Sequence, residues 1–316
     1  MRTLSHSKTA HPKEGVISVT PRITFAVPYY RGLEYLKKAL RSLQEQSNPN
    51  WVAIVVDDRG GEDAEETVLE LTDERISYIR NAQNLGLAGN WNVALSHATT
   101  EFVTIFHSDD ELETNYVELM LAVMDRHPYA VAGHCRTRVI GPDGEPLWSL
   151  PDEVKKVIRP RTKQDIVTAG QEGLLSITKG AWIFCPTLCY RRNLLPPDGF
   201  SAKWKFVLDV DLMARILFSG GSIVGTTEVG YRYRRHLTNQ TALLTESTVR
   251  FQEEFDHLTG VADLVRERGW KKVEKSARRK TVVRLHLLYQ ALRATVEMKW
   301  DRVTPLLLGA LRGQFN

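Results

Sequence analysis

The sequence predicts an α/β fold with an additional helical region, and three observations support this class. Short apolar runs rich in β-branched and aromatic residues alternate with longer segments of helical period from residue 23 to about residue 136. The 316 residues are 42% hydrophobic, which is enough apolar surface for one large core. Residues 243–316 show helical period throughout. Such alternation predicts a parallel sheet with crossover helices, followed by a helical appendage.

The expected strands are residues 23–27, 51–56, 76–79, 102–106 and 129–135. Between them, three helical segments each carry an apolar stripe, and packing onto the sheet explains these stripes best. The stripes are Leu33, Leu36, Leu40 and Leu43; Trp91, Leu95 and Ala98; and Val117, Met120 and Met124.

After residue 136 the alternation ends. Pro142-Asp143-Gly144 lies between short extended pieces and predicts a hairpin, and a polar stretch follows to Lys179. In the helical region, one stripe holds Phe251, Phe255 and Leu258, and another holds Val282, Leu285, Leu288 and Leu292. We therefore divide the chain into a flexible tail (1–21), an α/β half (22–136), a second half of the same domain (137–242) and a helical appendage (243–316).

Charge and cysteine content exclude several classes of protein. The 42 basic and 38 acidic side chains give a net charge of only +4, which does not favour nucleic-acid binding. Cys135, Cys185 and Cys189 are too few for a disulfide framework, and we expect them to be inert core thiols. The sequence begins without a signal peptide, and its apolar stretches are shorter than the roughly 20 residues of a membrane span. We expect a cytoplasmic protein.

Polar residues follow three of the expected strands. The first strand continues into Pro28-Tyr29-Tyr30-Arg31, the second into Asp57-Asp58-Arg59-Gly60-Gly61, and the fourth into His107-Ser108-Asp109-Asp110. Ligands of open α/β sheets bind at the carboxyl ends of the strands. We therefore expect these three strand ends to form one crevice.

The two acidic pairs suggest a site for a metal ion and a nucleotide. Asp109 and Asp110 repel each other unless a divalent cation lies between them and a phosphate, although aspartates at this position also cap helices. One carboxylate of Asp57-Asp58 can accept the ring N–H of uracil or thymine while the other holds the ribose, or the pair can simply form a turn. The sequence contains neither a GxGxxG motif after the first strand nor a GxxxxGK[ST] loop, so the diphosphate would be held by metal and side chains.

From about Ile23 to Thr241 the chain resembles the inverting glycosyltransferases of family 2, which have the GT-A fold. The segments that carry the resemblance are ITFAVPYYRGLEYLKKALRSLQEQ, VVDDRGGED, NLGLAGNWNVAL, FVTIFHSDDEL, CPTLCYRRNLL with PDGF, LDVDLMARI and YRYRRHLTNQT. Their order and spacing make the resemblance specific.

The resemblance implies roles for individual residues. Pro28 and Tyr30 would line the base, Asp57 and Asp58 would bind base and ribose, and Asn84 and Asn92 would border the donor site. Asp110 would be the principal metal ligand, with Asp109 contacting ribose or metal. His107 stands where many members carry a third acid. We expect Asp110 and Asp109, rather than His107, to bind the metal.

Two further segments supply catalytic and phosphate-binding candidates. Leu208-Asp209-Val210-Asp211 resembles the Glu-Asp motif that provides the catalytic base, with leucine in place of the first acid. Asp209 is then the favoured base, and Asp211 is the second candidate or the ion-pair partner of Arg215. In Tyr233-Arg234-Arg235-His236, the histidine would bind metal or diphosphate, and Arg234 and Arg235 would contact the phosphates; an ordinary basic loop is the alternative.

These observations predict a metal-dependent glycosyltransferase of the hexosyltransferase type. It would move one sugar from a UDP- or dTDP-sugar, with Mn²⁺ or Mg²⁺, to a hydroxyl of an unknown polysaccharide, glycolipid or secondary metabolite. The alternatives are a catalytically silent nucleotide-sugar-binding relative and a sugar nucleotidyltransferase. Basic residues between Arg266 and Arg284 predict a solvated helix face, or peripheral contact with anionic lipid at the inner face of the membrane.

Overall fold

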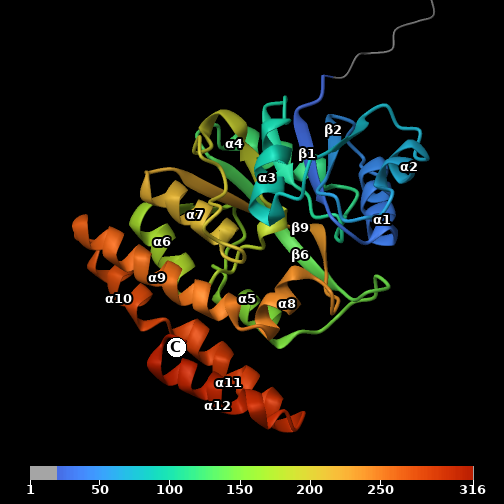
Figure 1. The fold of residues 1–316 in the computed structure, drawn as a ribbon. Helices are drawn as coiled ribbons and strands as arrows, with labels where there is room; N and C mark the ends of the chain where they lie inside the picture. Colours follow the sequence, from blue (N-terminus) through green and yellow to red (C-terminus); the bar gives the residue numbers. More distant parts are fainter. Residues whose placement is uncertain (1–19, 316) are drawn as a thin grey trace, which may run out of the picture.

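The computed structural model describes residues 20–315, and within them nine strands form a single mixed sheet (Figure 1). The order across the sheet is β3-β2-β1-β4-β8-β6-β9-β5, and β7 pairs with β9. The strands are β1 (Ile23–Tyr29), β2 (Trp51–Asp57), β3 (Ile76–Arg80), β4 (Phe102–Ile105), β5 (Glu111–Leu112), β6 (Ala132–Ile140), β7 (Ile166–Ala169), β8 (Cys189–Arg191) and β9 (Ser222–Arg234).

Helices flank this sheet and continue beyond it. They are α1 (Leu33–Gln44), α2 (Ala64–Leu69), α3 (Gly86–Ser96), α4 (Tyr116–Arg126), α5 (Leu150–Ile158), α6 (Gly170–Thr178), α7 (Leu208–Phe218), α8 (Gln240–Glu246), α9 (Val249–Glu267), α10 (Lys271–Arg279), α11 (Thr281–Val296) and α12 (Trp300–Arg312), with single 3-10 turns at Cys185–Thr187 (η1) and Arg192–Leu194 (η2). The predicted α/β class with a helical C-terminal region is confirmed. All but the last two residues of the predicted tail, 1–21, lie outside the described residues.

The first four strands form where the sequence predicts them. Adjacent strands β3, β2, β1 and β4 are mutually parallel because crossover helices connect them. Helix α1 buries Leu36, Leu40 and Leu43 against the sheet, as its apolar stripe predicts. Since parallel strands align their carboxyl ends, the segments after β1, β2 and β4 meet at one edge.

The second half of the domain continues the same sheet. Strand β6 begins later than predicted and extends to Ile140, because it runs parallel to β9 along most of its length. The division expected at residue 136 therefore falls inside a strand. The turn at Pro142-Asp143-Gly144 forms, but it closes only one bridge, between Ile140 and Pro146, so the predicted hairpin is minimal. The polar stretch that follows contains α5, β7 and α6.

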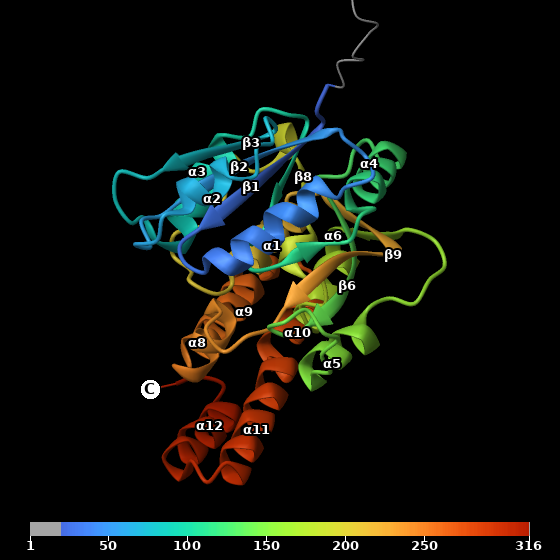
Figure 2. The same ribbon diagram turned by 90° about the vertical axis from the view of Figure 1, so that its right-hand side faces the viewer.

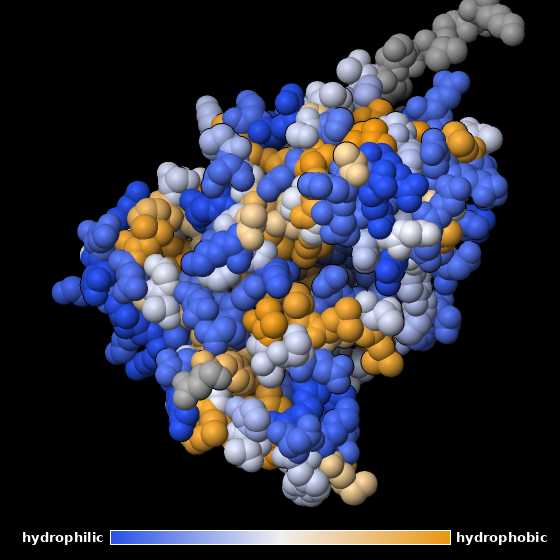
Figure 3. Space-filling view, in the orientation of Figure 1, coloured by the Kyte–Doolittle hydropathy of each residue, from blue (hydrophilic) through white to orange (hydrophobic). Residues whose placement is uncertain are grey.

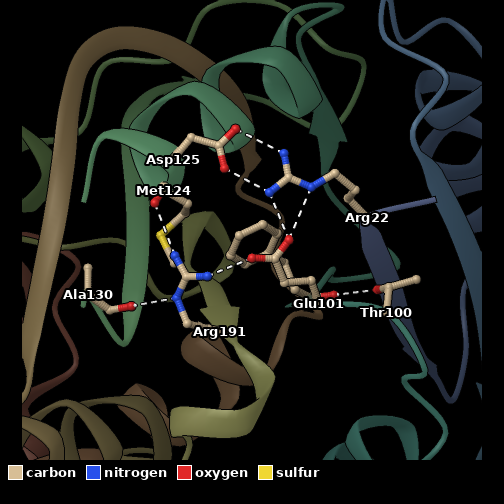
Figure 4. A network of polar contacts seen from close by, with 8 residues as sticks. Arg22, Thr100, Glu101, Met124, Asp125, Ala130 and Arg191 are labelled. Carbon is tan, nitrogen blue, oxygen red and sulfur yellow. Dashed lines mark hydrogen bonds and ion pairs between the residues drawn. The ribbon is translucent and has the colours of Figure 1, made fainter. Parts of the chain in front are cut away.

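The opposite edge of the sheet, where β1 and β4 begin, is held by ion pairs (Figure 4). Arg22 contacts Glu101 and Asp125, each at 2.7 Å, and Arg191 contacts Glu101 at 2.6 Å. The hydrogen bond to Asp125 is the main cause that raises the pKa of Arg22. These groups are partly exposed, so their contribution to stability is modest. The network joins β1, β4, α4 and β8 at the edge remote from the acidic strand ends.

The helical appendage follows its sequence pattern in one helix but not in another. Helices α11 and α12 project away from the sheet in both ribbon views (Figures 1 and 2). They share a small core with α9 that contains Phe251, Phe255, Val283 and Leu287, so the stripe predicted on α9 is confirmed. The stripe predicted on α11 is wrong: Leu285, Leu288 and Leu292 are 58%, 44% and 64% exposed.

The apolar residues of α11 are distributed around most of its circumference, so the sequence periodicity alone does not determine which face is buried. The alanines at positions 291 and 294 allow α12 to approach closely. On the face shown in Figure 3, apolar groups are interspersed with polar ones over this lower part of the molecule. Among the described residues, none of the helices combines the length and apolar character of a membrane span.

Candidate active site

The segments at the carboxyl ends of β1 and β2 are in direct contact. The amide of Asp58 donates to the carbonyl of Tyr29 at 2.9 Å, and Arg31 donates to the carbonyl of Gly60 at 3.1 Å. A Cβ at Gly60 would lie 1.3 Å from the carbonyl oxygen of Tyr30. Only glycine permits this approach, so the sequence Asp57-Asp58-Arg59-Gly60 places two acids beside the β1 exit.

The exit of β4 contains the second acidic pair and meets the end of β9. Nε2 of His236 lies 2.9 Å from a carboxylate oxygen of Asp109. Asp110 is 1% exposed and accepts hydrogen bonds from the Tyr231 hydroxyl at 2.9 Å and from the Arg234 amide at 2.7 Å. The antiparallel pairing of β5 with β9 brings residues 109–111 and 231–236 together.

The two carboxylates have opposite pKa shifts. Burial, followed by the charge of Asp109, raises the pKa of Asp110 well above its ordinary value. Burial alone would raise the pKa of Asp109 too, but the hydrogen bond from His236 lowers it. Asp110 therefore carries the cost of the charge on Asp109, which a bound cation would relieve.

His107 completes a group with the geometry of a metal site. One ligand atom each from His107, Asp109 and Asp110 lies within 4.8 Å of the others. Burial lowers the pKa of His107, which keeps the imidazole in the neutral form that binds metals. Its Nε2 is buried without a hydrogen-bond partner among the described residues. Carboxylate oxygens and a neutral imidazole fit a divalent ion such as Mn²⁺.

Asp57 and Asp58 have distinct surroundings. Asp57 is fully buried and accepts from the Tyr78 hydroxyl at 2.7 Å and from Arg80 at 3.1 Å. Asp58 accepts from the amides of Leu85 and Gly86 at 2.8 and 2.9 Å, at the start of α3. The carboxylate of Asp58 thus holds the N-terminus of α3. Asp57 instead has a partner that reaches solvent, because the Arg80 side chain is 44% exposed.

The remaining predicted donor residues lie around the same edge. Asn84 donates to the Asp58 carbonyl at 3.1 Å. Asn92 exchanges hydrogen bonds of 2.8 Å with the backbone of Phe200, which joins α3 to the segment before α7. Pro28 is partly buried, and Tyr30 is 42% exposed. The asparagines therefore position loops, whereas Tyr30 offers an open ring face.

Arg234 and Arg235 are both engaged within the protein. Arg234 is 1% exposed and donates to the carbonyls of Asp109, Gly141 and Pro142 and to the carboxylate of Glu111. Arg235 forms a two-pronged ion pair with Asp152 at 2.6 and 2.7 Å. This arrangement favours a role in shaping the loops around the acids over direct contact with phosphate.

The two candidate bases at the start of α7 also differ. Both carboxylate oxygens of Asp211 are occupied, one by the Trp204 indole at 3.1 Å and the other by Arg215 at 2.9 Å. In the described part of the chain, the Cys185 thiol is the one side chain that hydrogen-bonds Asp209, and burial raises the pKa of Asp209. Contact with Arg215, expected from the i+4 spacing, is confirmed. The geometry favours Asp209 as the base.

Some residues of this region escape sequence reasoning. Tyr231 and Glu111 support the acids from β9 and β5, and Glu62 accepts from the Tyr29 hydroxyl and the Gly32 amide. All three lie inside segments that carry the family resemblance, but nothing in the sequence assigns a role to any of them. Cys185 is also more than a core thiol, because it contacts Asp209, whereas Cys135 and Cys189 are buried.

The sequence matches the profile of glycosyl transferase family 2 over residues 24–184, half of the chain. The chain therefore belongs to glycosyl transferase family 2.

Several curated proteins are similar to parts of this chain. The UDP-Glc:α-D-GlcNAc-diphosphoundecaprenol β-1,3-glucosyltransferase WfgD of Escherichia coli is 29% identical over 102 residues, covering 32% of this chain and 40% of that protein. The GalNAc(5)-diNAcBac-PP-undecaprenol β-1,3-glucosyltransferase of Campylobacter jejuni is 34% identical over 119 residues, covering 36% and 38%. The chain thus spans about two fifths of the length of these relatives. The glycosyltransferase EpsH of Bacillus subtilis is 33% identical over 70% of this chain and 62% of its own length.

Solved structures show the same fold at low sequence identity. S. aureus TarS 1–349 in complex with UDP-GlcNAc has a TM-score of 0.61 at 16% identity, covering 93% of this chain and 92% of that one. The mannosyltransferase PcManGT from Pyrobaculum calidifontis, in complex with GDP-Man and Mn²⁺, has a TM-score of 0.58 at 16% identity, covering 93% and 87%. With the family membership, this likeness establishes the GT-A fold and supports a nucleotide-sugar glycosyltransferase.

Proposed function

We propose that this protein transfers a single sugar, with inversion, from a UDP- or dTDP-sugar to a hydroxyl group of an acceptor. One observation carries the proposal: the ends of β1, β2 and β4 meet at one edge, where Asp109, Asp110 and His236 lie together. In this proposal residues 22–136 form the donor half, 137–242 the acceptor half and 243–316 an appendage.

The donor nucleotide would lie at the exits of β1 and β2. Tyr30 and Pro28 would line the base, and Asp57 would accept its ring N–H. Asp58, Asn84 and Asn92 would act by fixing the loops that border the nucleotide. Guanine also carries a ring N–H, so the preference for UDP or dTDP is tested by comparison with GDP-sugars.

The diphosphate would lie against Asp109, Asp110 and His236. A divalent ion, Mn²⁺ or Mg²⁺, would be held by Asp109 and Asp110, with His236 or the nearby His107 as a further ligand. When bound, such an ion neutralises charge that develops on the departing nucleoside diphosphate. The mannosyltransferase neighbour supports this assignment because its structure contains Mn²⁺. Arg234 would contribute by bracing the Asp109 backbone, and Arg235 by fixing α5 through Asp152.

Asp209 would remove the proton from the acceptor hydroxyl as its oxygen attacks the anomeric carbon. Inversion follows when this attack comes from the face opposite the leaving diphosphate. The raised pKa of Asp209 makes its carboxylate a stronger base than an exposed aspartate. Asp211 would hold the start of α7 through Trp204 and Arg215.

The acceptor would be a polysaccharide, a glycolipid or a secondary metabolite. The names of two relatives specify sugars linked to diphosphoundecaprenol, which supports the glycolipid class. Peripheral contact with the inner face of an anionic membrane would suit such an acceptor. Exposed Lys271, Lys272 and Lys275 on α10 and exposed Leu288 and Leu292 on α11 support that contact.

The proposal is tested by measuring nucleoside-diphosphate release from UDP-, dTDP- and GDP-sugars, with Mn²⁺ or with a chelator. We expect slow hydrolysis of one donor, which stops when the chelator is added. Binding of a donor without release, even with mixed acceptor extracts present, would instead identify a catalytically silent relative. Release of pyrophosphate from a sugar phosphate and a nucleoside triphosphate would identify a nucleotidyltransferase, which the family membership does not favour.

A further inference from the structure

A second concave site lies on the acceptor side of the domain, between β6, α5 and the segment just before η1. It adjoins the candidate base. Lys155, which lines it, interacts electrostatically with Asp209, and Cys185, the neighbour of the lining residue Phe184, contacts the Asp209 carboxylate. A group bound here would therefore lie close to the acceptor hydroxyl that Asp209 deprotonates.

The charge of this pocket is unusual. Its lining includes Arg136, Lys155, Lys156 and Arg159, and none of the lining residues is acidic. Lys156 pairs with Glu153 at 2.6 Å. Within residues 20–315, the other three cations make no ion pair shorter than 4 Å with an acidic side chain.

The contacts that these cations do make are with neutral groups. The Lys155 ammonium lies 3.9 Å from the centre of the Phe184 ring, and Arg159 donates to the Thr226 carbonyl at 2.8 Å. Burial, followed by the charge of Arg136, lowers the pKa of Arg159 to about 10. Arg136 and Arg159 thus raise each other's electrostatic energy, and an anion between them would remove that cost.

Two neutral polar atoms of the lining residues lie behind the surface of the pocket. The hydroxyl of Thr137 is buried without a hydrogen bond among the described residues, and so is Nε2 of His134. Burial and Arg159 lower the pKa of His134 to about 3, so its ring stays neutral and adds no charge. A bound anion would therefore be held by the cations of the pocket.

We propose that this pocket binds a phosphate or diphosphate group carried by the acceptor substrate, so that the acceptor is a phosphorylated glycoside. Three cations without acidic partners match the several charges and oxygens of a diphosphate better than the single charge of a carboxylate. The donor diphosphate has its own place at Asp109, Asp110 and His236. Phe184 and Tyr233, with ring centres 5.4 Å apart, stand at the border between the pocket and that cluster.

This inference rests on the proposed function and names the acceptor class for the same site. Its first test is calorimetric titration of inorganic pyrophosphate into the full chain, with EDTA present so that no metal supports binding at the donor cluster. The wild type should bind pyrophosphate, and the Arg136→Ala/Lys155→Ala double variant should bind it at least about tenfold more weakly. Lys155→Arg should retain the affinity. Arg41→Ala removes an exposed cation on α1, outside the pocket, and should leave pyrophosphate binding unchanged.

A second set of measurements tests whether the pocket serves the acceptor or the donor. The affinity of the double variant for a nucleotide-sugar with Mn²⁺ should stay within about twofold of the wild type. With an alkyl glycosyl diphosphate and the matching alkyl glycoside as acceptors, the wild type should show a lower KM for the diphosphate, and the double variant should lose that advantage.

Three results would overturn the inference: no pyrophosphate binding by the wild type, equal binding by the double variant, or a parallel loss of donor affinity, which would assign the pocket to the donor. None of them coincides with failure of the proposed function, which would appear as absence of nucleoside-diphosphate release by the wild type.

Discussion

The acidic cluster at the end of β4 and the basic pocket beside Asp209 handle charge in opposite ways. In the cluster, the charged side chains have close partners in the protein: Arg234 with Glu111, and His236 with Asp109. In the pocket, Arg136, Lys155 and Arg159 make no ion pair shorter than 4 Å with an acidic side chain of the described residues. Ion pairs within the protein hold the cluster in shape before a ligand arrives, whereas cations without such pairs lower their energy by binding an anion. We therefore expect the cluster to position its ligand and the pocket to attract one.

The largest expected effect is the loss of turnover when Asp209, the candidate base between the acidic cluster and the basic pocket, is substituted. Asp209→Asn should lower kcat by about 10²- to 10⁴-fold because it removes the proton acceptor. Donor affinity should stay within about twofold, since Asp209 is not part of the donor cluster. Steady-state kinetics and donor titration measure these values.

Asp211→Asn is the matched control, two residues away on the same helix. It should lower the free energy of unfolding by about 1–3 kcal/mol through its contacts with Trp204 and Arg215, while kcat changes by less than about tenfold. If Asp211→Asn abolished turnover and Asp209→Asn kept it, the two roles would have to be exchanged.

A comparison of two arginines tests the contrast in charge directly. Arg234→Met should cost about 3–5 kcal/mol of unfolding free energy, because three carbonyls lose their donor and Glu111 keeps only the more exposed Arg232 as a partner. Arg136→Met, in the pocket, should change stability by less than about 0.5 kcal/mol, since Arg136 is exposed. Urea denaturation followed by circular dichroism measures both. Equal costs would show that the two regions do not differ in this way.

The smallest expected effect is a pH dependence of anion binding in the pocket. Burial lowers the pKa of Lys155 to about 8. Asp152 on its own helix and Asp209 on α7 act to raise it, whereas Arg235, just after β9, and Arg250 on α9 act to lower it further. Lys155 is therefore charged below this pH and neutral above it. The affinity for pyrophosphate should be full near pH 7 and fall by about tenfold by pH 9.

Lys155→Arg serves as the control for this titration, because a guanidinium keeps its charge across the range. Its affinity should stay level where that of the wild type falls. A wild-type profile as flat as that of Lys155→Arg would remove Lys155 from the anion site.

The parts of the fold that follow periodic patterns could be predicted from the sequence. Strands β1 to β4 and the buried stripe of α1 depend on local alternation of apolar and polar residues. The buried face of α11 could not be predicted, because Leu285, Leu287 and Leu288 are equally apolar and only the neighbouring helix decides which of them is covered. The extension of β6 was missed for a similar reason, since it depends on pairing with β9, a strand about ninety residues away in the sequence.

Within the candidate site, the sequence indicated which residues meet but not how each one is used. The proximity of Asp109, Asp110 and His236 follows from the motifs. Side-chain direction does not, so the engagement of Arg234 with carbonyl groups became visible only in the structure. The basic pocket gave no signal, because Arg136 and Lys155 belong to segments that become neighbours only when β6 and α5 pack together.

The most direct test of the central claim is the effect of Mn²⁺ on nucleotide affinity in the wild type and in Asp110→Asn. UDP, dTDP and GDP would each be titrated into both proteins, with Mn²⁺ and with a chelator, after thermal unfolding has shown that the variant is folded. We predict that Mn²⁺ strengthens binding of one nucleotide at least about tenfold in the wild type and has no such effect in the variant. Equal affinity with and without Mn²⁺ in the wild type, or an undiminished effect in Asp110→Asn, would contradict a metal-assisted donor site at the end of β4.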